Sequence, residues 1–381
     1  MPSFLIAPPR SALLIWATAL TLLTPAFAQA QVPSYRLDII DKLPGDVVAS
    51  GLKVNEAGQV LASGTRLVNN VQQAVFSVWS NPGQSYVPSL SGFSPGYITD
   101  NGNLVGGYFP GVISLAPNGT ITQLSSGQRN DYRSVAAVAP NGDYAGTDDF
   151  SSQSIYLNRG GADSRTGLAF SQKPRTWAGM NNRGDIAGTT DNGDGLTINQ
   201  AWIIRNGAAA VKLTSTASGF TGGIFLLDLD SRGRVLGQIT NGTGNRFAIW
   251  DTNNLPTLLS APDGFYTEGF KFNASSTVLA NFRSLTGLQS AYFGINTPSG
   301  NYSWAQIANV TGTWRVLGLQ DISDSGYIVG TAEANGQVVA FRMTPLSAVP
   351  EPSTLLSMAL GGVGLLYLKR RRLKTQADRA V

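Results

Sequence analysis

Between residues 35 and 345, short apolar runs alternate with turns rich in Gly, Asn, Asp and Ser. Several runs contain β-branched and aromatic residues, such as Phe247–Trp250, and Tyr35–Ile39 alternates apolar with polar side chains. Apolar side chains at every second position, in short runs bounded by turn residues, are typical of β-strands. In a helix the apolar side chains would recur about every 3.6 residues. The pattern therefore predicts an all-β fold for residues 35–345.

One motif recurs through this region. It begins, in most copies, with a small polar residue, which is followed by Gly three residues later, an apolar pair, and then Gly or Ala. In the seven copies the Gly position is occupied by Gly58, Gly102, Gly142, Gly184, Gly233, Ser276 and Gly326. Copies spaced 40–50 residues apart have the period of a β-propeller, in which each repeat forms one blade.

The chemistry of the motif is that of a hairpin turn. The polar side chain at the first position can accept a backbone hydrogen bond, and Gly three residues later can adopt the left-handed conformation that closes the turn. The small residue four positions after this Gly predicts a close backbone approach, as near a crowded propeller axis.

Each turn motif is followed by an aromatic-rich strand, and most copies add a short fourth strand, such as Thr120–Leu124. One repeat therefore predicts a four-stranded blade. The seventh copy ends near Pro345 without a fourth strand, and the N-terminal run Tyr35–Ile40 has no blade of its own. We expect this run to complete blade seven and seal the ring. The predicted fold is a seven-bladed β-propeller over residues 35–345; eight short blades or a pair of β-sandwiches are the alternatives.

The N-terminus, residues 1–28, has the pattern of a secretory signal. Arg10 precedes the apolar core Leu13–Leu23, and Ala26-Phe27-Ala28 offers a small-x-small cleavage site before Gln29. Ala28-Gln29-Ala30 is a second candidate site, and an uncleaved start-anchor helix is the alternative. The middle of the chain is thus expected to be exported.

The C-terminus contains three signals in a fixed order. Residues 346–353 form a linker that includes Val349-Pro350-Glu351-Pro352-Ser353, where two prolines prevent a helix. The apolar run Thr354–Leu368 predicts a transmembrane anchor, and the basic tail 369–381 begins with Lys369-Arg370-Arg371-Arg372. Four cations after an apolar run follow the positive-inside rule. A buried C-terminal helix is the alternative.

These residues resemble the PEP-CTERM sorting signal of Gram-negative bacteria. The resemblance implies recognition by an exosortase-like membrane enzyme, an intermediate anchored in the inner membrane, and a final location at the cell surface or outside the cell. It also implies a link to exopolysaccharide and biofilm. The chain departs from the pattern by continuing from Leu373 to Val381.

The repeat is similar to the HAF repeat of bacterial exported proteins. The likeness rests on turns such as Met180–Gly188 and on strands such as Gln73–Phe76 and Arg246–Trp250, in which the His of that repeat is absent.

Composition excludes several kinds of chemistry. The chain has neither Cys nor His, so zinc, iron and copper sites lack their usual ligands, and Ser-His-Asp or Cys-His catalysis is ruled out. Residues 29–349 contain 20 of the 27 Lys and Arg residues and 21 of the 23 Asp and Glu residues, a net charge of −1. This balance predicts no nucleic-acid partner. We expect no cofactor and no resident metal.

Few side chains suggest a site. Asp191-Asn192-Gly193-Asp194-Gly195 resembles a calcium loop but has Gly at two ligand positions, and Asp148-Asp149 is an adjacent carboxylate pair on a predicted exposed loop. Acids recur in the turns, and we expect them to bond the backbone. They are Asp100, Asp143, Asp185, Asp230 and Asp324. Trp177, Trp304 and Trp314 are candidates for stacking on sugars.

Two functional hypotheses follow. The first is a non-enzymatic surface or matrix protein whose propeller binds a polysaccharide or protein. The second is a carboxylate-dependent glycosidase or lyase that acts on exopolysaccharide, which requires two or three carboxylates to converge in the axial funnel.

Overall fold

The computed structural model of the protein describes residues 35–40, 45–80, 83–86, 92–108, 111–124, 134–147, 155–166, 174–191, 198–214, 223–241, 244–259, 265–284, 289–296, 302–306 and 314–346. The predicted signal, anchor and basic tail lie outside these residues. Within them, all regular elements are β-strands. A search of the same residues for a helix that could cross a membrane found none.

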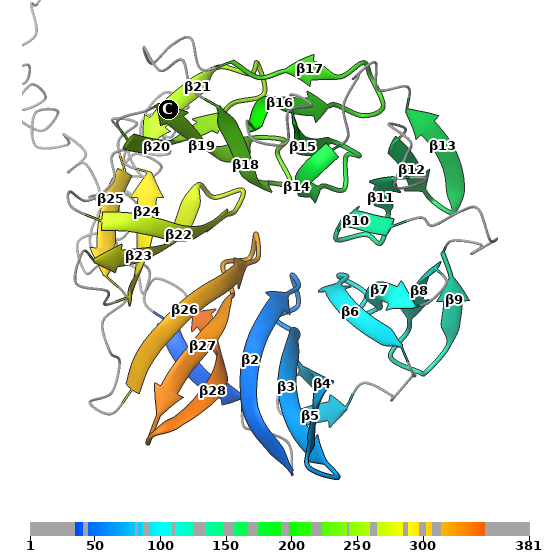
Figure 1. Cartoon of the computed structure of the whole chain (residues 1–381), viewed down its shortest axis with the longest axis vertical. Helices are drawn as coiled ribbons and strands as arrows, with labels where there is room; N and C mark the ends of the chain where they lie inside the picture. The colour runs from blue at the N-terminus through cyan, green and yellow to red at the C-terminus, as the bar shows by residue number, and fades with distance from the viewer. Residues whose placement is uncertain are drawn as a thin grey trace, which may run out of the picture.

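The strands form seven four-stranded antiparallel sheets. Figure 1 shows the sheets arranged around a central axis, with β2, β6, β10, β14, β18, β22 and β26 innermost. The prediction of an all-β propeller with four strands in each sheet is confirmed. The sheets contain β2 (Asp46–Val54), β3 (Val60–Val68), β4 (Val71–Ser80) and β5 (Gly83–Tyr86); β6 (Phe93–Ile98), β7 (Leu104–Tyr108), β8 (Gly111–Leu115) and β9 (Ile121–Gln123); β10 (Ser134–Val138), β11 (Tyr144–Thr147), β12 (Ile155–Arg159) and β13 (Ala162–Thr166); β14 (Pro174–Met180), β15 (Ile186–Asp191), β16 (Ile198–Ile204) and β17 (Val211–Lys212); β18 (Ile224–Leu229), β19 (Val235–Asn241), β20 (Gly244–Trp250) and β21 (Pro256–Leu259); β22 (Phe265–Phe272), β23 (Thr277–Ser284), β24 (Gln289–Asn296) and β25 (Tyr302–Gln306); and β26 (Trp314–Ile322), β27 (Ile328–Ala334) and β28 (Gln337–Pro345) with β1 (Tyr35–Ile40).

Each predicted turn joins the first two strands of a sheet. In all seven, the backbone N–H at the Gly position donates to the carbonyl of the first turn residue at 2.9–3.0 Å. All seven residues at this position have positive φ, including Ser276 at 66°. In six turns the first side chain also accepts the N–H four residues later, as Asn55 does from Gln59 at 2.9 Å. Ala139 has no such acceptor, and Asn141 bonds the N–H of Asp143 instead, at 3.0 Å.

In four of the seven copies, the glycine four positions after the turn Gly avoids a collision within its own sheet; these are Gly106, Gly188, Gly237 and Gly330. A Cβ atom at Gly106 would collide with the carbonyl oxygen of Ser94 in β6, and one at Gly330 would collide with that of Gly318 in β26. The predicted close approach is confirmed, but the neighbouring backbone is the bulged innermost strand of the same sheet. The expected crowding at the axis is therefore not its cause.

Two adjacent glycines test this explanation. We expect Gly106→Ala to lower the free energy of unfolding by about 1–3 kcal/mol, the usual cost of overpacking. Gly107→Ala is the matched control, because a Cβ atom there meets nothing within 4 Å. Urea unfolding of both variants measures the difference, and equal midpoints would contradict the collision.

The core lies between neighbouring sheets. One cluster combines Ala201 and Ile203 of β16 with Val235, Ala248 and Trp250 of the next sheet. A second combines residues of β19–β21 with Phe272, Val278 and Ala280 of the sheet after that. Strand aromatics such as Trp250 and Phe272 therefore pack between neighbouring blades.

The N-terminal strand closes the ring. β1 pairs antiparallel with β28, from Tyr35 opposite Pro345 to Ile40 opposite Ala340. Arg342 of β28 joins this sheet to the first: its guanidinium donates to the Gly58 carbonyl at 2.6 Å and to Asp38 of β1 at 2.8 Å. The same group lies 4.2 Å from the centroid of the Trp79 ring and 5.3 Å from that of Tyr327. The predicted pairing of Tyr35–Ile40 with the last repeat is confirmed.

Candidate functional site

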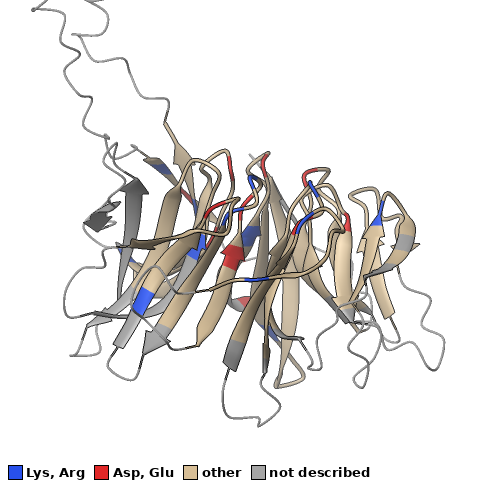
Figure 2. Cartoon of the chain, turned by 90° about the horizontal axis from the view of Figure 1, so that it is seen from above, with Lys and Arg blue, Asp and Glu red and all other residues tan. Residues whose placement is uncertain are grey.

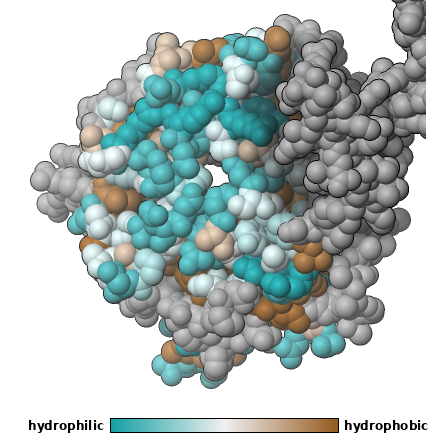
Figure 3. All heavy atoms as spheres, turned by 180° about the vertical axis from the view of Figure 1, so that it is seen from behind, coloured by the Kyte–Doolittle hydropathy of each residue, from teal (hydrophilic) through white to brown (hydrophobic). Residues whose placement is uncertain are grey.

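A pocket of about 360 Å³ lies at the axis, where all seven sheets contribute to its wall. It opens on the side of the turns, since Glu56, Pro140, Ser231 and Asp324 line it together with the ends of the innermost strands. Figure 2 shows that acidic and basic residues gather at the turns on one side of the ring. The face in Figure 3 is largely hydrophilic around a central opening. We call this pocket the axial funnel.

The residue two positions before the first residue of each turn supplies most of the charged side chains of the funnel. We call this the axial position. Six of these residues line the pocket; they are Lys53, Tyr97, Gly179, Asp228, Lys271 and Asp321. The seventh, Ala137, is buried in the core, and its neighbours Ala136 and Val138 line the pocket instead.

A β-bulge directly precedes the axial position in six sheets, where the register of the first strand skips one residue. In the seventh sheet the irregularity comes earlier, between Thr267 and Gly269. Bulges change the direction in which the following side chains point, and they occur often next to functional sites. Here they set the residues that meet at the axis.

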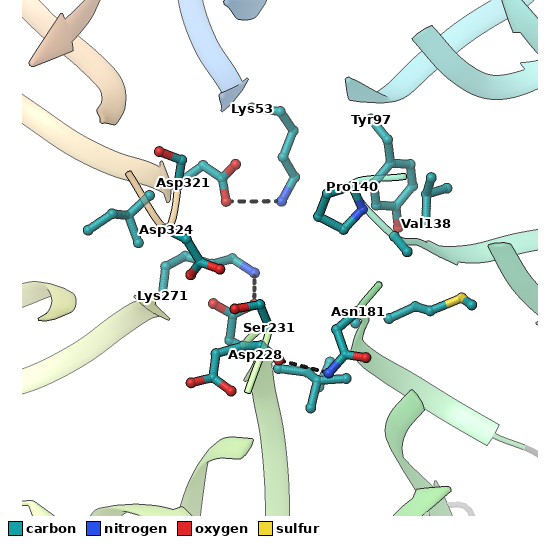
Figure 4. Close-up of a pocket in the computed structure, with 18 of the residues that line it drawn as sticks. Lys53, Tyr97, Val138, Pro140, Asn181, Asp228, Ser231, Lys271, Asp321 and Asp324 are labelled. Carbon is teal, nitrogen blue, oxygen red and sulfur yellow. Dashed lines mark hydrogen bonds and ion pairs between the residues drawn. The ribbon is translucent and has the colours of Figure 1, made fainter. Parts of the chain in front are cut away.

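Two lysine–aspartate pairs occupy one half of the funnel. Lys53 Nζ lies 3.3 Å from Asp321 Oδ1, and Lys271 Nζ lies 2.9 Å from Asp228 Oδ1. In each pair the second carboxylate oxygen accepts the N–H of the residue after the lysine, Val54 at 3.1 Å and Phe272 at 3.0 Å. Figure 4 shows both pairs facing the same space. The same two-point contact is thus built twice, and each copy joins adjacent sheets.

The environment shifts the pKa values of these groups. Burial raises the pKa of Asp228, and the charge of Lys271 reverses only part of that change. Burial lowers the pKa of Lys53, but the charges of Asp321 and Asp228 outweigh it, so the net change is upward. Burial also raises the pKa of Tyr97, whose hydroxyl donates to the Ala136 carbonyl at 2.9 Å. At neutral pH Lys53 is therefore charged.

The predicted turn acids bond backbone groups, often of the next sheet. Asp100 accepts the N–H of Glu56 at 3.3 Å, Asp324 accepts that of Ala274 at 2.6 Å, and Glu56 accepts that of Asp324 at 2.7 Å. These three carboxylates lie near one another. Burial is the largest cause that raises the pKa of Asp100, and the charges of Glu56 and Asp324 raise it further, whereas the hydrogen bond from the N–H of Glu56 lowers it.

The remaining turn acids are tied in similarly. Asp143 accepts the N–H of Gly160 at 2.9 Å, Asp185 accepts that of Asn206 at 3.2 Å, and Asp230 accepts that of Arg234 at 2.7 Å. Asp185 and Asp230 also pair with the side chains of Arg183 and Arg234. The expectation that these acids bond the backbone is confirmed.

The other half of the funnel includes several apolar side chains. Trp177, Val138 and Met180 line it, with the small residues Ala136 and Gly179 between them. The half-buried Trp177 ring packs edge to face with Trp202, at 5.6 Å between centroids. The side chains of Trp304 and Trp314, the other predicted stacking residues, lie outside what the structure describes.

The two acidic segments that resemble metal sites lie mostly outside the described residues. Among the described residues, no group of three or more acidic residues is placed to hold a metal ion. Asp191 ends β15, but residues 192–197 of the calcium-like loop and the pair Asp148-Asp149 are outside the described ranges.

A family model described as the PEP-CTERM protein-sorting motif matches residues 348–372. The chain carries a PEP-CTERM sorting motif. The match includes the predicted sorting residues Val349–Ser353 and the basic cluster Lys369–Arg372. The motif indicates an exported protein that an exosortase processes through a membrane-anchored intermediate.

The PEP-CTERM motif follows the last strand closely. Only Leu346 and Ser347 stand between β28 and the first matched residue. The end of β28 lies on the turn side of the ring, because a Cβ atom at Gly326 would be 3.6 Å from the Pro345 ring. The chain therefore leaves the propeller toward its sorting motif on the side where the funnel opens.

Comparison with solved structures shows the fold alone. Virginiamycin B lyase from Staphylococcus aureus is 12% identical, with a TM-score of 0.50 over 82% of this chain and 100% of the lyase. The acylaminoacyl peptidase of Pyrococcus horikoshii is 11% identical, with a TM-score of 0.53 over 80% of this chain and 53% of the peptidase. No curated protein matches the sequence.

Proposed function

We propose that this protein is a seven-bladed propeller that is exported, released by an exosortase and displayed at the cell surface or in the extracellular matrix. There it acts as a non-enzymatic binding or structural module linked to exopolysaccharide or biofilm. The observation that carries the proposal is the sorting motif attached directly to a ring sealed by β1. The seven turn motifs and seven sheets support seven blades, with β1 and β28 together in the last.

The hydrogen bonding of the funnel acids supports a binding module over an enzyme. Asp228 and Asp321 each bond a lysine and a backbone N–H, and Glu56 bonds the turn of the adjacent sheet. A general acid or base has to exchange its proton with a substrate atom within hydrogen-bond reach. Carboxylates bonded in this way serve the structure of the ring first.

One observation favours the glycosidase or lyase alternative, namely that Asp228 lies in the funnel with a raised pKa. Incubating the protein with exopolysaccharide of its host and measuring new reducing or unsaturated ends tests it. If the wild-type protein forms product and Asp228→Asn does not, the enzyme is favoured. If the wild-type protein forms no product, the binding module is favoured.

Processing is the direct test of the sorting route. In a host that contains an exosortase, we expect the released protein to lack Lys369–Arg372, because the motif directs removal of the tail. Replacement of Pro350, Glu351 and Pro352 by Ala should leave the tail attached, whereas replacement of Leu346 and Ser347 by Ala should not. Mass spectrometry of the C-terminal peptides measures the outcome. Released protein that still contains Lys369–Arg372 would overturn the route.

A further inference from the structure

We propose that the axial funnel binds the end of a neutral polysaccharide chain, through the hydroxyl groups of its terminal pyranose rings. The inference rests on the proposed function and names the ligand class of the binding module. The volume of about 360 Å³ lies at the lower end of the range of small-molecule pockets, about 300–1,000 Å³. It admits the end of a chain and excludes a folded partner.

The charged side chains of the two lysine–aspartate pairs balance one another. Asp228, Lys271, Asp321 and Lys53 come from four consecutive sheets around the ring, so their charges alternate and sum to zero. A charged ligand would leave an unbalanced charge in a partly buried space, which is unfavourable. The half of the funnel that contains the two lysine–aspartate pairs therefore favours a ligand without net charge.

The lysine–aspartate pairs have unused hydrogen-bonding capacity. Among the described residues, each lysine ammonium has one carboxylate acceptor in the funnel, although it carries three N–H donors. Each carboxylate in turn accepts two hydrogen bonds of about four that its lone pairs allow. The funnel thus offers donors and acceptors side by side. Sugar hydroxyls both donate and accept, and they match this alternation better than a group that only accepts.

The rim of the funnel is acidic. Glu56, Asp230 and Asp324 line the mouth of the funnel, and within the described part of the chain only Asp230 of these three is paired with a cation, Arg234. An anionic sugar such as a uronic acid would have to pass these carboxylates and would be repelled. The rim therefore discriminates against acidic polysaccharides.

Part of the wall of the funnel is apolar. Trp177, Val138 and Met180 face the space that the small residues Ala136 and Gly179 leave open. The C–H face of a pyranose packs on apolar and aromatic side chains, while its hydroxyl groups point to polar ones. A ring placed between the two halves of the funnel would use both.

Neutral and acidic oligosaccharides of matched size test the inference. The full-length protein, purified in a detergent without a sugar head group, is titrated calorimetrically with tetrasaccharides of glucose, galactose and mannose, and with the corresponding uronates. We expect one or more neutral tetrasaccharides to bind, and the matching uronate to bind at least about tenfold more weakly, a difference of about 1.4 kcal/mol. Tighter binding of a uronate, or no binding of any neutral sugar, would overturn the inference.

A variant that fills the funnel locates the binding. Ala136→Leu places a larger side chain in the pocket without removing an ion pair, and it keeps the backbone carbonyl that accepts the Tyr97 hydroxyl. We expect it to weaken binding at least about tenfold with no change in melting temperature. Gly107→Ala, which is not part of the pocket lining and adds a Cβ atom with nothing within 4 Å, is the matched control. Unchanged affinity in Ala136→Leu would place the sugar elsewhere and contradict the proposal.

The two levels of the proposal fail in different ways. If the protein is processed and binds another macromolecule but none of the neutral sugars, the proposal that the funnel binds neutral polysaccharide is refuted. The proposal of a binding module then still stands. An unprocessed tail on released protein refutes the sorting route whatever the sugars do.

Discussion

Replacing Arg342 by Ala should lower the free energy of unfolding by about 3 kcal/mol, the cost of breaking a buried ion pair on one side. Arg342 is 4% exposed and contacts three parts of the ring closure at once. It bonds Asp38 of β1 and the Gly58 carbonyl of the first turn, and it lies over the Trp79 ring of β4. Its loss leaves the buried Gly58 carbonyl without this donor and the Trp79 ring without its cation.

Arg36 provides the matched control. It bonds the same carboxylate, Asp38, at 2.9 Å, but its own side chain is 53% exposed. Arg36→Ala should therefore leave the midpoint of urea unfolding unchanged, because exposed ion pairs contribute little. Arg342→Met, which keeps the packing of the stem, should recover part of the loss. Equal effects of Arg36→Ala and Arg342→Ala on the urea midpoint would show that the ion pairs of Asp38, and not the buried contacts of Arg342 with Gly58 and Trp79, stabilise the ring closure.

The hairpins were predictable because their causes are local. A polar residue and a Gly three positions apart fix the turn through bonds that span at most four residues, as at Asn55–Gln59. The regular spacing of these turns then gives the propeller period without any knowledge of long-range contacts. Even the degenerate copy at Ser276 follows the rule, because its backbone takes the same left-handed conformation with φ of 66°.

Ring closure was predictable by elimination. A strand at Tyr35–Ile40 without a sheet, and a last repeat that ends after three strands, leave each other as partners, as their pairing confirms. The buried contacts of Arg342 were not predictable, because its partners Asp38 and Gly58 are 304 and 284 residues away in the chain. Nothing in the local sequence distinguishes this arginine from an exposed strand residue.

The funnel was not predictable from residue types, because the axial position contains Lys, Tyr, Ala, Gly or Asp in different repeats. A signal was nevertheless present. Aligning the seven copies on the first turn residue places Asp228, Lys271, Asp321 and Lys53 in one column. Opposite charges in neighbouring repeats of a closed ring predict contacts across blade boundaries, as the two ion pairs show.

The turn acids show where the sequence argument was incomplete. Their role as backbone acceptors follows from turn chemistry, but for two of them, Asp100 and Asp324, the N–H donor belongs to an adjacent sheet. The N–H of Glu56 reaches Asp100 across 44 residues, and the N–H of Asp324 reaches Glu56 across 268. The turns therefore form a hydrogen-bonded rim as well as closing hairpins, which holds the mouth of the funnel in one shape.

Replacing Lys271 by Met should destabilise the protein at neutral pH by about 2 kcal/mol, below the 3–5 kcal/mol for a fully buried pair because both side chains are partly exposed. Without Lys271, the N–H of Phe272 still donates to Asp228, and the charge of Lys53 acts on it from a neighbouring pair. Burial already raises the pKa of Asp228, and loss of the lysine charge should raise it further. A carboxyl whose pKa is higher in the folded than in the unfolded state is destabilising only where it is ionised.

The destabilisation should therefore depend on pH in a defined direction. Relative to wild type, Lys271→Met should lose little stability near the unfolded pKa of Asp, about 3.9, and progressively more as the pH rises through the higher pKa of folded Asp228. The double variant Lys271→Met with Asp228→Asn should remove this dependence, since no carboxylate remains to ionise. Lys212→Met, on the exposed strand β17, controls for the loss of one positive charge. Urea unfolding at pH 4, 6 and 8 measures all four proteins, and a loss of equal size at every pH would show that Lys271 stabilises the ring by packing alone.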